Sequence, residues 1–193
     1  MRSKVPRELR IIGGSWRGRR FRFPDHVDIR PTPDRVRETL FNWLATSIVG
    51  ARCVDAFAGS GALGLEALSR GAASVHFLER EPRAAFALQE RLQEWHAIGA
   101  SVVRGDSLSW LRGQRPVDLP PFDLAFLDPP FAQDLVRPTW QALIDGDWLA
   151  PGARVYAESS ADAVALEPPV GWKLVRSKIA GDVGYHLAEQ GDS

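Results

Sequence analysis

Apolar residues along this chain follow two alternating patterns, one typical of buried strands and the other typical of amphipathic helices. Short apolar runs predict strands at 52–57, 74–79, 101–104, 122–127, 154–158, 172–178 and 183–187. Apolar positions three or four residues apart predict helices ending near residue 70, beginning at residue 82, and covering 108–111 and 135–144. This alternation predicts a doubly wound, mostly parallel α/β sheet of the Rossmann type. A short turn at 180–182 makes the last two strands an expected antiparallel pair.

The N-terminal part has a different pattern. Apolar and polar residues alternate over 8–23, which predicts a β-hairpin with Gly13-Gly14 in its turn. After a proline-rich loop, a helix is expected, with Thr32 as its cap and Pro33 at its first helical position.

Charge divides the chain into two parts. The 193 residues have a formal net charge of zero, but residues 1–25 carry eight basic and two acidic side chains, a local charge of +6. Such asymmetry is typical of a basic arm attached to an acidic body. We therefore expect an RNA-binding hairpin arm over 1–25 and one catalytic domain over 26–193.

The single cysteine, Cys53, lies in an apolar run, so it is expected to be a core residue of a protein in a reducing compartment. No apolar run approaches the length of a membrane span, and the N-terminus lacks the apolar stretch of a signal peptide. The sequence thus predicts a cytoplasmic protein, with a monomer as the expected state.

A glycine-rich loop directly follows the first predicted strand of the sheet. Gly59, Gly61 and Gly64 form a Gly-x-Gly-x-x-Gly pattern that opens a helix. The first two glycines allow a tight bend and close approach to a ligand, and the third allows the helix to pack on the sheet. Dinucleotide oxidoreductases share this pattern, so it predicts a nucleotide-like cofactor without fixing its identity.

Acidic residues at strand ends narrow the choice of cofactor. Asp55, at the first strand's end, suits the ammonium of an amino-acid cofactor and would repel a pyrophosphate. Glu79 ends the second strand, where a carboxylate can accept both ribose hydroxyls, and Asp106 could accept from an adenine amine. Each acid could instead be a helix cap or a solvated loop residue. The predicted S-adenosylmethionine-binding residues are Asp55, Phe57, Ala58, Gly59, Ser60, Gly61, Gly64, Glu79, Arg80, Asp106 and Ser107.

The predicted catalytic motif is Asp128-Pro129-Pro130-Phe131, directly after the fourth strand of the sheet. The exocyclic amine of a base is a poor nucleophile because its lone pair is delocalised into the ring. A carboxylate from Asp128 and the Pro129 carbonyl could accept its two hydrogens and stabilise the positive charge that develops on nitrogen. The two prolines fix the backbone, and Phe131 could stack on the base. By itself the motif could also be a simple turn after a strand.

Together these motifs resemble the amino-methyltransferases of nucleic acids, whose signature is Asn/Asp-Pro-Pro-Tyr/Phe. The segments 10–18, 30–38, 55–67 and 128–131 are similar to the ribosomal RNA small subunit methyltransferase D family. The resemblance implies a seven-stranded methyltransferase sheet with an N-terminal hairpin and an antiparallel last strand. It further implies methylation of N2 of guanine 966, in the RNA's own numbering, of 16S rRNA in a partly assembled 30S subunit, with no metal.

The arm interleaves cations with aromatic side chains, as RNA-binding strands do. Phe21 and Phe23 are expected in the core, while neighbouring arginines face phosphate. Arg30, Arg35 and Arg37 could orient the target near the pocket, although salt bridges within the helix, for example by Asp34, would explain them equally well. The predicted RNA-binding residues are Arg10, Arg17, Arg19, Arg20, Arg22, Arg30, Arg35 and Arg37.

Three alternatives stay open from the residues themselves. An adenine-N6 methyltransferase on DNA shares the Asp-Pro-Pro motif but usually needs a separate target-recognition domain. A nicotinamide oxidoreductase shares the glycine loop. A non-catalytic RNA-binding assembly factor could retain a similar pocket.

Overall fold

A computed structural model describes residues 8–23, 32–130, 133–162 and 166–191 of the chain. Its main feature is a seven-stranded sheet with the strand order β5-β4-β3-β6-β7-β9-β8. The strands are β3 (Arg52–Asp55), β4 (Ser74–Glu79), β5 (Ala100–Arg104), β6 (Phe122–Leu127), β7 (Leu149–Ser160), β8 (Trp172–Ala180) and β9 (Val183–Gln190). The helices are α1 (Asp34–Trp43), α2 (Ala62–Ser69), α3 (Pro82–Glu94), α4 (Ser107–Leu111) and α5 (Val136–Asp145).

The sheet is parallel except at one strand. Strands β3 to β7 pair in parallel, whereas β9 is antiparallel to both β7 and β8. The turn between β8 and β9 begins after Ala180, which pairs with Val183. This confirms the Rossmann-like sheet and the antiparallel pair that the sequence predicted. Strand β3 ends at Asp55, two residues earlier than expected, and β7 is longer than expected.

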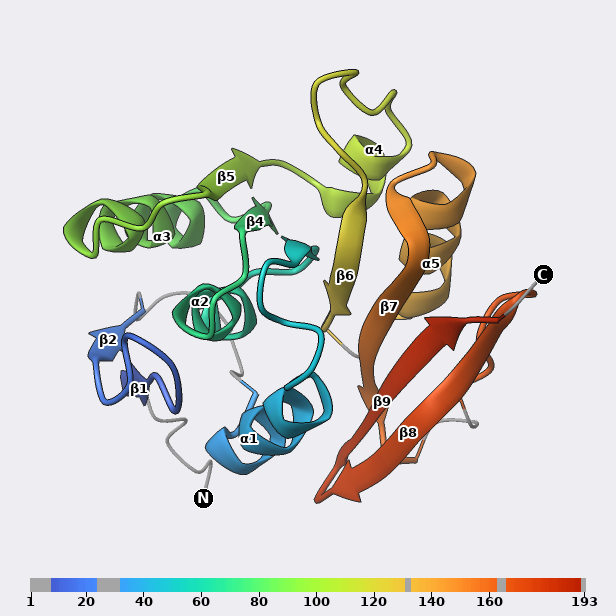
Figure 1. The fold of residues 1–193 in the computed structure, drawn as a ribbon, viewed down its shortest axis with the longest axis horizontal. Coiled ribbons are helices and arrows are strands. Elements are labelled where there is room, and N and C mark those ends of the chain that lie inside the picture. Colours follow the sequence, from blue (N-terminus) through green and yellow to red (C-terminus); the bar gives the residue numbers. More distant parts are fainter. Residues whose placement is uncertain (1–7, 24–31, 131–132, 163–165, 192–193) are drawn as a thin grey trace.

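Helices cover the sheet on both faces (Figure 1). Leu124 and Phe126 of β6 contribute to a core that includes apolar residues of α1, α2 and α3. Their neighbours Ala125 and Leu127 point to the other face, into a core shared with α4 and α5. A strand covered on both sides has no polar face, which explains the nearly continuous apolar run of β6. None of the described helices is long and apolar enough to cross a bilayer.

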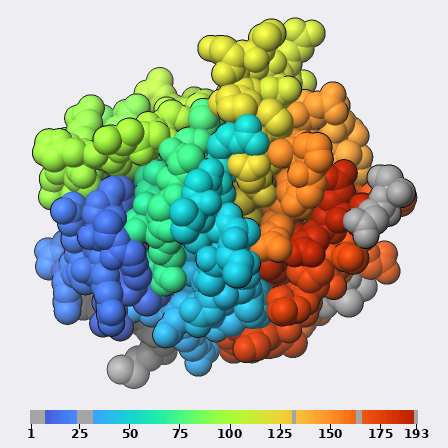
Figure 2. Space-filling view, viewed as in Figure 1, coloured from blue at the N-terminus to red at the C-terminus, as the bar shows by residue number. Residues whose placement is uncertain are grey.

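The N-terminal hairpin is packed against this body. Strands β1 (Glu8–Arg10) and β2 (Arg20–Arg22) pair antiparallel. Phe21 and Phe23 are buried as predicted, and Trp95 at the end of α3 contacts the rings of Trp16 and Phe21 edge-on. In the space-filling view the blue hairpin lies directly against the green surface of α2 and α3 (Figure 2).

The connection between the two hairpin strands differs from the predicted tight turn at Gly13-Gly14. It covers residues 11–19 and extends to the end of α2, where the Ser15 amide donates to the Ser69 carbonyl at 2.7 Å. Gly14 has a φ of 75°, and a Cβ there would lie 1.8 Å from that carbonyl oxygen. The glycine is therefore required by close approach to α2 rather than by a two-residue turn.

A buried carboxylate, Glu66 of α2, anchors this connection. Its oxygens accept hydrogen bonds from the Ile12 amide at 2.9 Å and the Gly13 amide at 2.8 Å. The same side chain is bonded to Arg70 at 2.8 Å and lies 3.4 Å from Arg37. Glu66 is fully buried, so these partners replace the water that the charge loses on burial.

For Arg37 the sequence left two roles open, orienting the RNA target and forming a salt bridge within the helix, and the structure contradicts the first. Its side chain is fully buried and donates to Asp34 at 2.6 Å and to the Arg10 carbonyl at 2.9 Å, in addition to its contact with Glu66. A guanidinium enclosed in this way is not placed to contact RNA. The alternative of a salt bridge within the helix therefore holds for Arg37. Its side chain joins α1, α2 and the hairpin.

Candidate active site

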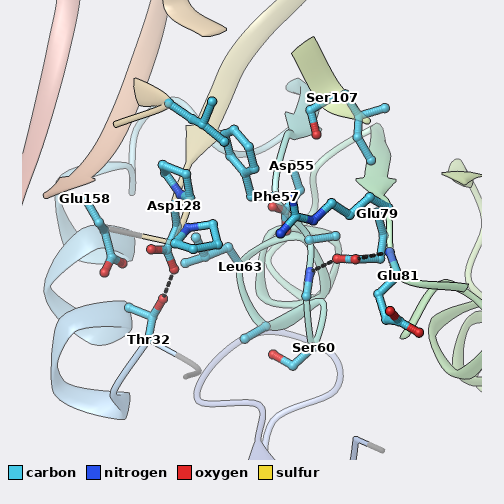
Figure 3. Close-up of a pocket in the computed structure, with 18 of the residues that line it drawn as sticks. Thr32, Asp55, Phe57, Ser60, Leu63, Glu79, Glu81, Ser107, Asp128 and Glu158 are labelled. Atoms are coloured by element: carbon cyan, nitrogen blue, oxygen red, sulfur yellow. Dashed lines mark hydrogen bonds between the residues drawn. The ribbon is translucent and has the colours of Figure 1, made fainter. Parts of the chain in front are cut away.

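A cavity of about 560 Å³ opens at the carboxyl ends of the central strands. Its lining includes Asp55 at the end of β3, Glu79 at the end of β4, Asp128 after β6 and Glu158 of β7 (Figure 3). The strand order changes direction between β3 and β6, and ligands of open α/β sheets bind at such a switch point. The volume is within the usual range for a small-molecule site.

The glycine loop has the conformation that its sequence requires. Gly61, with a φ of 79°, precedes the first turn of α2, and Gly59 also has a positive φ of 53°. A Cβ at Gly64 would lie 2.1 Å from the Phe77 ring. The third glycine therefore lets α2 pack closely on the sheet, as predicted.

Asp55 holds the glycine loop in place through a hydrogen bond. It is buried, and its Oδ2 accepts the Gly64 amide at 3.1 Å. Burial raises the pKa of Asp55 to about 7, and the hydrogen bond from Gly64 opposes this shift. The neighbouring Asp128 and Glu79 charges raise the pKa further. A cationic group bound in the cavity would favour the ionised form.

Glu79 joins the loop to β4. Its Oε2 accepts the Gly59 amide at 2.6 Å, and its Oε1 accepts the Glu81 amide at 2.7 Å. Each carboxylate oxygen has a second lone pair, so these bonds orient the group while ribose hydroxyls can still be accepted. The carboxylate lies on the cavity wall where the sequence placed it (Figure 3).

Asp106 and its neighbours form the outer end of the cavity. The Asp106 side chain accepts the Ser109 amide at 2.8 Å, so it caps α4 and lines the cavity as well. This hydrogen bond lowers the pKa of the Asp106 carboxyl. Ser107 is buried and donates to the Ala56 carbonyl, whereas the exposed Arg80 donates to Gln133 at 3.3 Å.

Most of the predicted cofactor residues share this one cavity. Its lining includes Asp55, Phe57, Ala58, Gly59, Ser60, Glu79, Arg80, Asp106 and Ser107. Gly61 and Gly64 do not line it and act through the backbone and the packing of α2.

Asp128 faces the same cavity, with Pro129 and Pro130 beside it. Thr32 Oγ1 donates to Asp128 Oδ2 at 3.0 Å (Figure 3). Burial raises the pKa of Asp128, and the Thr32 hydrogen bond opposes the rise. The fourth residue of the motif, Phe131, lies outside the described residues, so its predicted stacking role stays a prediction.

Thr32 was expected to cap α1, with Pro33 inside the helix. Instead Pro33 occupies the cap position with no side-chain hydrogen bond, and the helix begins at Asp34. The Thr32 hydroxyl points to Asp128, so its role is in the cavity.

The lining is strongly acidic. Among the described lining residues there are six carboxylates and one arginine, Arg80, the acids being Asp55, Glu79, Glu81, Asp106, Asp128 and Glu158. The field of such a wall attracts a cationic ligand and repels a pyrophosphate. This favours a sulfonium and ammonium compound over a nicotinamide dinucleotide.

Comparisons with known proteins agree with this geometry. Residues 9–189 match the family described as conserved hypothetical protein 95. The chain is 46% identical to ribosomal RNA small subunit methyltransferase D of Escherichia coli strain K12, over 96% of this chain and 93% of the relative. The chain belongs to the ribosomal RNA small subunit methyltransferase D family.

Two further similar proteins support the family assignment. The Haemophilus influenzae protein of the same name is 43% identical, over 93% of each chain. The solved structure of yhhF from Escherichia coli, named as a methyltransferase, superposes with a TM-score of 0.87 at 44% identity. It covers 96% of this chain and 99% of that one. Membership of a methyltransferase family favours methyl transfer over the hydride transfer left open by the glycine loop.

Among the cavity residues without a predicted role there, Thr32 and Glu158 lie on the side of Asp128. Thr32 is 4% exposed, and its link to Asp128 is a contact across 96 positions that local patterns do not reveal. Glu158 is buried, and the Tyr156 hydroxyl donates to its Oε1 at 2.7 Å. The signal for Glu158 was present, because it ends the predicted strand 154–158 as Asp55 and Glu79 end theirs.

The other predicted RNA-binding arginines that the structure describes lie outside the cavity lining. Arg17, Arg19, Arg20 and Arg22 are exposed on the hairpin. Arg20 bonds to Glu8 at 2.8 Å, and the Arg19 guanidinium lies 5.4 Å from the centre of the Trp95 ring. Arg10 is exposed and is bonded to Asp34 at 2.8 Å, and Arg35 is exposed as well. Arg30 lies outside the described residues.

Proposed function

We propose that this protein transfers a methyl group from S-adenosylmethionine to the exocyclic N2 amine of a guanine in 16S rRNA. The proposal extends to guanine 966 and to a partly assembled 30S subunit as substrate, which the resemblance of the sequence motifs implies. The observation that carries the proposal is that Asp128 and the pair Asp55 and Glu79 line one cavity, with the glycine loop between them.

The cofactor half of the cavity fits S-adenosylmethionine by the chemistry of its residues. Asp55 and Glu79 are buried carboxylates next to the loop, suited to an ammonium and to ribose hydroxyls. Asp106 lies at the outer end, suited to an adenine amine. The bound cofactor supplies an electrophilic methyl group on a positively charged sulfur, which the acidic lining would favour.

The substrate half of the cavity is built around Asp128. Its carboxylate and the Pro129 carbonyl accept the two hydrogens of the base amine, which favours a pyramidal nitrogen with an available lone pair. Both groups also stabilise the positive charge that develops on nitrogen. The methylated ammonium is acidic and loses its proton readily, so no strong general base is required.

The exposed arginines of the hairpin are proposed to bind RNA phosphates. Arg17, Arg19, Arg20 and Arg22 are all exposed, while Phe21 and Phe23 of the same hairpin are buried, so the cations lie on the outer surface. A target base within structured RNA must be splayed out to reach Asp128. Because the arm is short, we expect the shape of the ribonucleoprotein to supply much of the specificity.

The decisive experiment uses 30S particles from cells that lack this protein, incubated with labelled S-adenosylmethionine. We expect N2-methylguanosine in the digested 16S rRNA with the wild-type protein and background labelling with Asp128→Ala. Mass analysis of the nucleoside distinguishes guanine from adenine as the target. N6-methyladenosine, or full activity of Asp128→Ala, would overturn the proposal. Naked 16S rRNA serves as the comparison for the particle, and equal methylation of both would refute the preference for a ribonucleoprotein.

A further inference from the structure

A second carboxylate lies on the substrate side of the cavity. The parallel pairing of β6 and β7 sets Leu127 opposite Ala157, so Asp128, the first residue after β6, comes next to the level of Glu158 within β7. Both side chains line the cavity. Figure 3 shows them together with Thr32 on one side of the site, while Glu79 and Glu81 lie on the other.

The Glu158 carboxylate is held in a defined orientation. Its residue is 2% exposed, and its Oε1 accepts the hydroxyl of Tyr156, which is itself fully buried. Burial raises the pKa of the Tyr156 hydroxyl and the Glu158 charge raises it further, so this group remains a donor. A buried, oriented carboxylate is suited to recognising a hydrogen-bond donor on a ligand.

The proposed substrate presents two donors side by side. The Watson–Crick edge of guanine has the N1–H next to the N2 amine, whereas adenine has an N1 lone pair next to its N6 amine. Cytosine likewise has a ring lone pair next to its amine. Two neighbouring carboxylates match only the edge on which both positions donate, because a lone pair facing a carboxylate is repelled.

Resting on the function proposed above, we propose that Glu158 accepts the N1–H of the target guanine while Asp128 holds its N2 amine. Glu158 thereby determines the choice of base. Tyr156 is a positioning residue that orients Glu158. Asp128 alone would accept the amine of guanine, adenine or cytosine, so the selection requires the second carboxylate.

The test compares two target bases in a semisynthetic 16S rRNA assembled into particles. One carries guanine at the target position, and the other carries 2-aminopurine, which keeps the amine but has a lone pair in place of the N1–H. Losing a hydrogen bond to a charged acceptor reduces the rate by roughly 10- to 100-fold. We expect the wild-type protein to prefer guanine by this factor under single-turnover conditions.

Glu158→Ala is expected to lower the guanine rate to about that of 2-aminopurine while leaving the 2-aminopurine rate nearly unchanged. A variant that merely folds poorly would lower both rates. Glu158→Gln, which keeps the shape and can present either an oxygen or an NH₂ group, is expected to remove most of the preference without loss of stability. Glu81→Ala, which alters an acid on the cofactor side, is the matched control and should keep the wild-type ratio.

Equal losses on both bases in Glu158→Ala and Glu158→Gln, with the preference retained, would overturn the role of Glu158 and leave guanine methylation standing. Absence of the wild-type preference for guanine would also overturn it. Failure of the wild-type protein to methylate guanine, with adenine accepted in its place, would overturn the proposed function together with this inference.

Discussion

The Thr32 hydroxyl, at the entry to α1, donates a 3.0 Å hydrogen bond to Oδ2 of Asp128, which lies 96 positions further along the chain. This bond opposes the effect of burial, which raises the pKa of Asp128. It also holds the carboxylate in one orientation. Thr32 therefore positions the proposed catalytic group without touching the reacting nitrogen.

Replacing Thr32 by valine keeps the shape and removes the donor. We expect the methyl-transfer rate to fall by about 10-fold, the lower end of the effect of one hydrogen bond to a charged acceptor. The acidic limb of the pH–rate profile should move to higher pH, because the pKa of Asp128 then rises further. Thr32→Ser keeps the hydroxyl and should restore both properties. A reduced rate with an unshifted profile would assign Thr32 a purely structural role.

Asp128 itself can be tested by two substitutions of different chemistry. Asp128→Ala removes the acceptor, and we expect a loss of roughly 10²- to 10³-fold in rate. Asp128→Asn keeps one acceptor oxygen and should retain measurable activity, since the signature of the nucleic-acid amino-methyltransferases allows either residue. Isothermal titration with S-adenosylmethionine is the control, and both variants should bind it with near wild-type affinity.

At neutral pH, the buried Asp55 carboxylate is expected to lower the free energy of unfolding. Burial raises its pKa to about 7, so the folded state binds this proton more tightly than the unfolded state does. Its contribution to stability is present in acid and is lost as pH rises from about 4 to about 7. Asp55→Asn should therefore raise the free energy of unfolding at pH 8 by up to roughly 4 kcal/mol and leave it unchanged below pH 4.

Urea titrations at several pH values measure this difference directly. The same substitution should weaken S-adenosylmethionine binding, because the charge that suits a cationic ligand is gone. A stability difference that stayed constant across the pH range would show that Asp55 does not titrate as proposed.

The buried ion cluster around Arg37 predicts a stability effect without an RNA effect. Arg37→Ala leaves the Glu66 charge short of a buried partner, and we expect a loss of about 3–5 kcal/mol in the free energy of unfolding. Arg35→Ala, at an exposed site of the same helix, is the matched control and should change stability by less than about 0.5 kcal/mol. If Arg37→Ala instead weakened RNA binding at unchanged stability, Arg37 would contact RNA and would not be a structural residue of the core.

The proposed arm is tested by reversing its charge. Replacing Arg17, Arg19, Arg20 and Arg22 by glutamate should abolish RNA methylation, with an affinity loss of at least roughly 100-fold and a weaker dependence on salt. Cofactor binding should be unaffected. The matched control replaces the exposed Arg104 and Arg137, which lie outside the hairpin, by glutamate. This double variant is compared with a second double variant in which Arg17 and Arg19 are replaced by glutamate. Full activity of the fourfold variant would refute the role of the arm.

The sequence predicted the elements that repeat a simple period. Strands β4 and β6 were placed to the residue, because an apolar run bounded by turn residues leaves little choice. The cofactor half of the site could be predicted equally well from the sequence, because acids at strand ends meet at one edge of a parallel sheet. Asp55, Glu79 and Asp106 share the cavity for this reason.

What the sequence did not reveal are contacts between distant segments. Thr32 had a good local role as a helix cap, and only the folded chain shows the competing acceptor on Asp128. Arg37 resembled its exposed neighbours until the fold placed Glu66 against it. The glycine pair at 13–14 fitted a tight turn equally well, although its actual constraint is the Ser69 carbonyl of another element.

Helix α2 has a consequence for how a target can be chosen. Its first turn follows the glycine loop at the cavity, and Glu66 and Ser69 further along hold the hairpin. With eight residues the helix measures only about 12 Å, and a short helix packed in a core does not stretch. The arm and the methyl donor would thus sit on one rigid spacer. If the arm binds phosphates as proposed, a nucleotide is selected by its distance from those phosphates, so a ribosomal site shifted by one nucleotide would miss the cavity even if its base were correct.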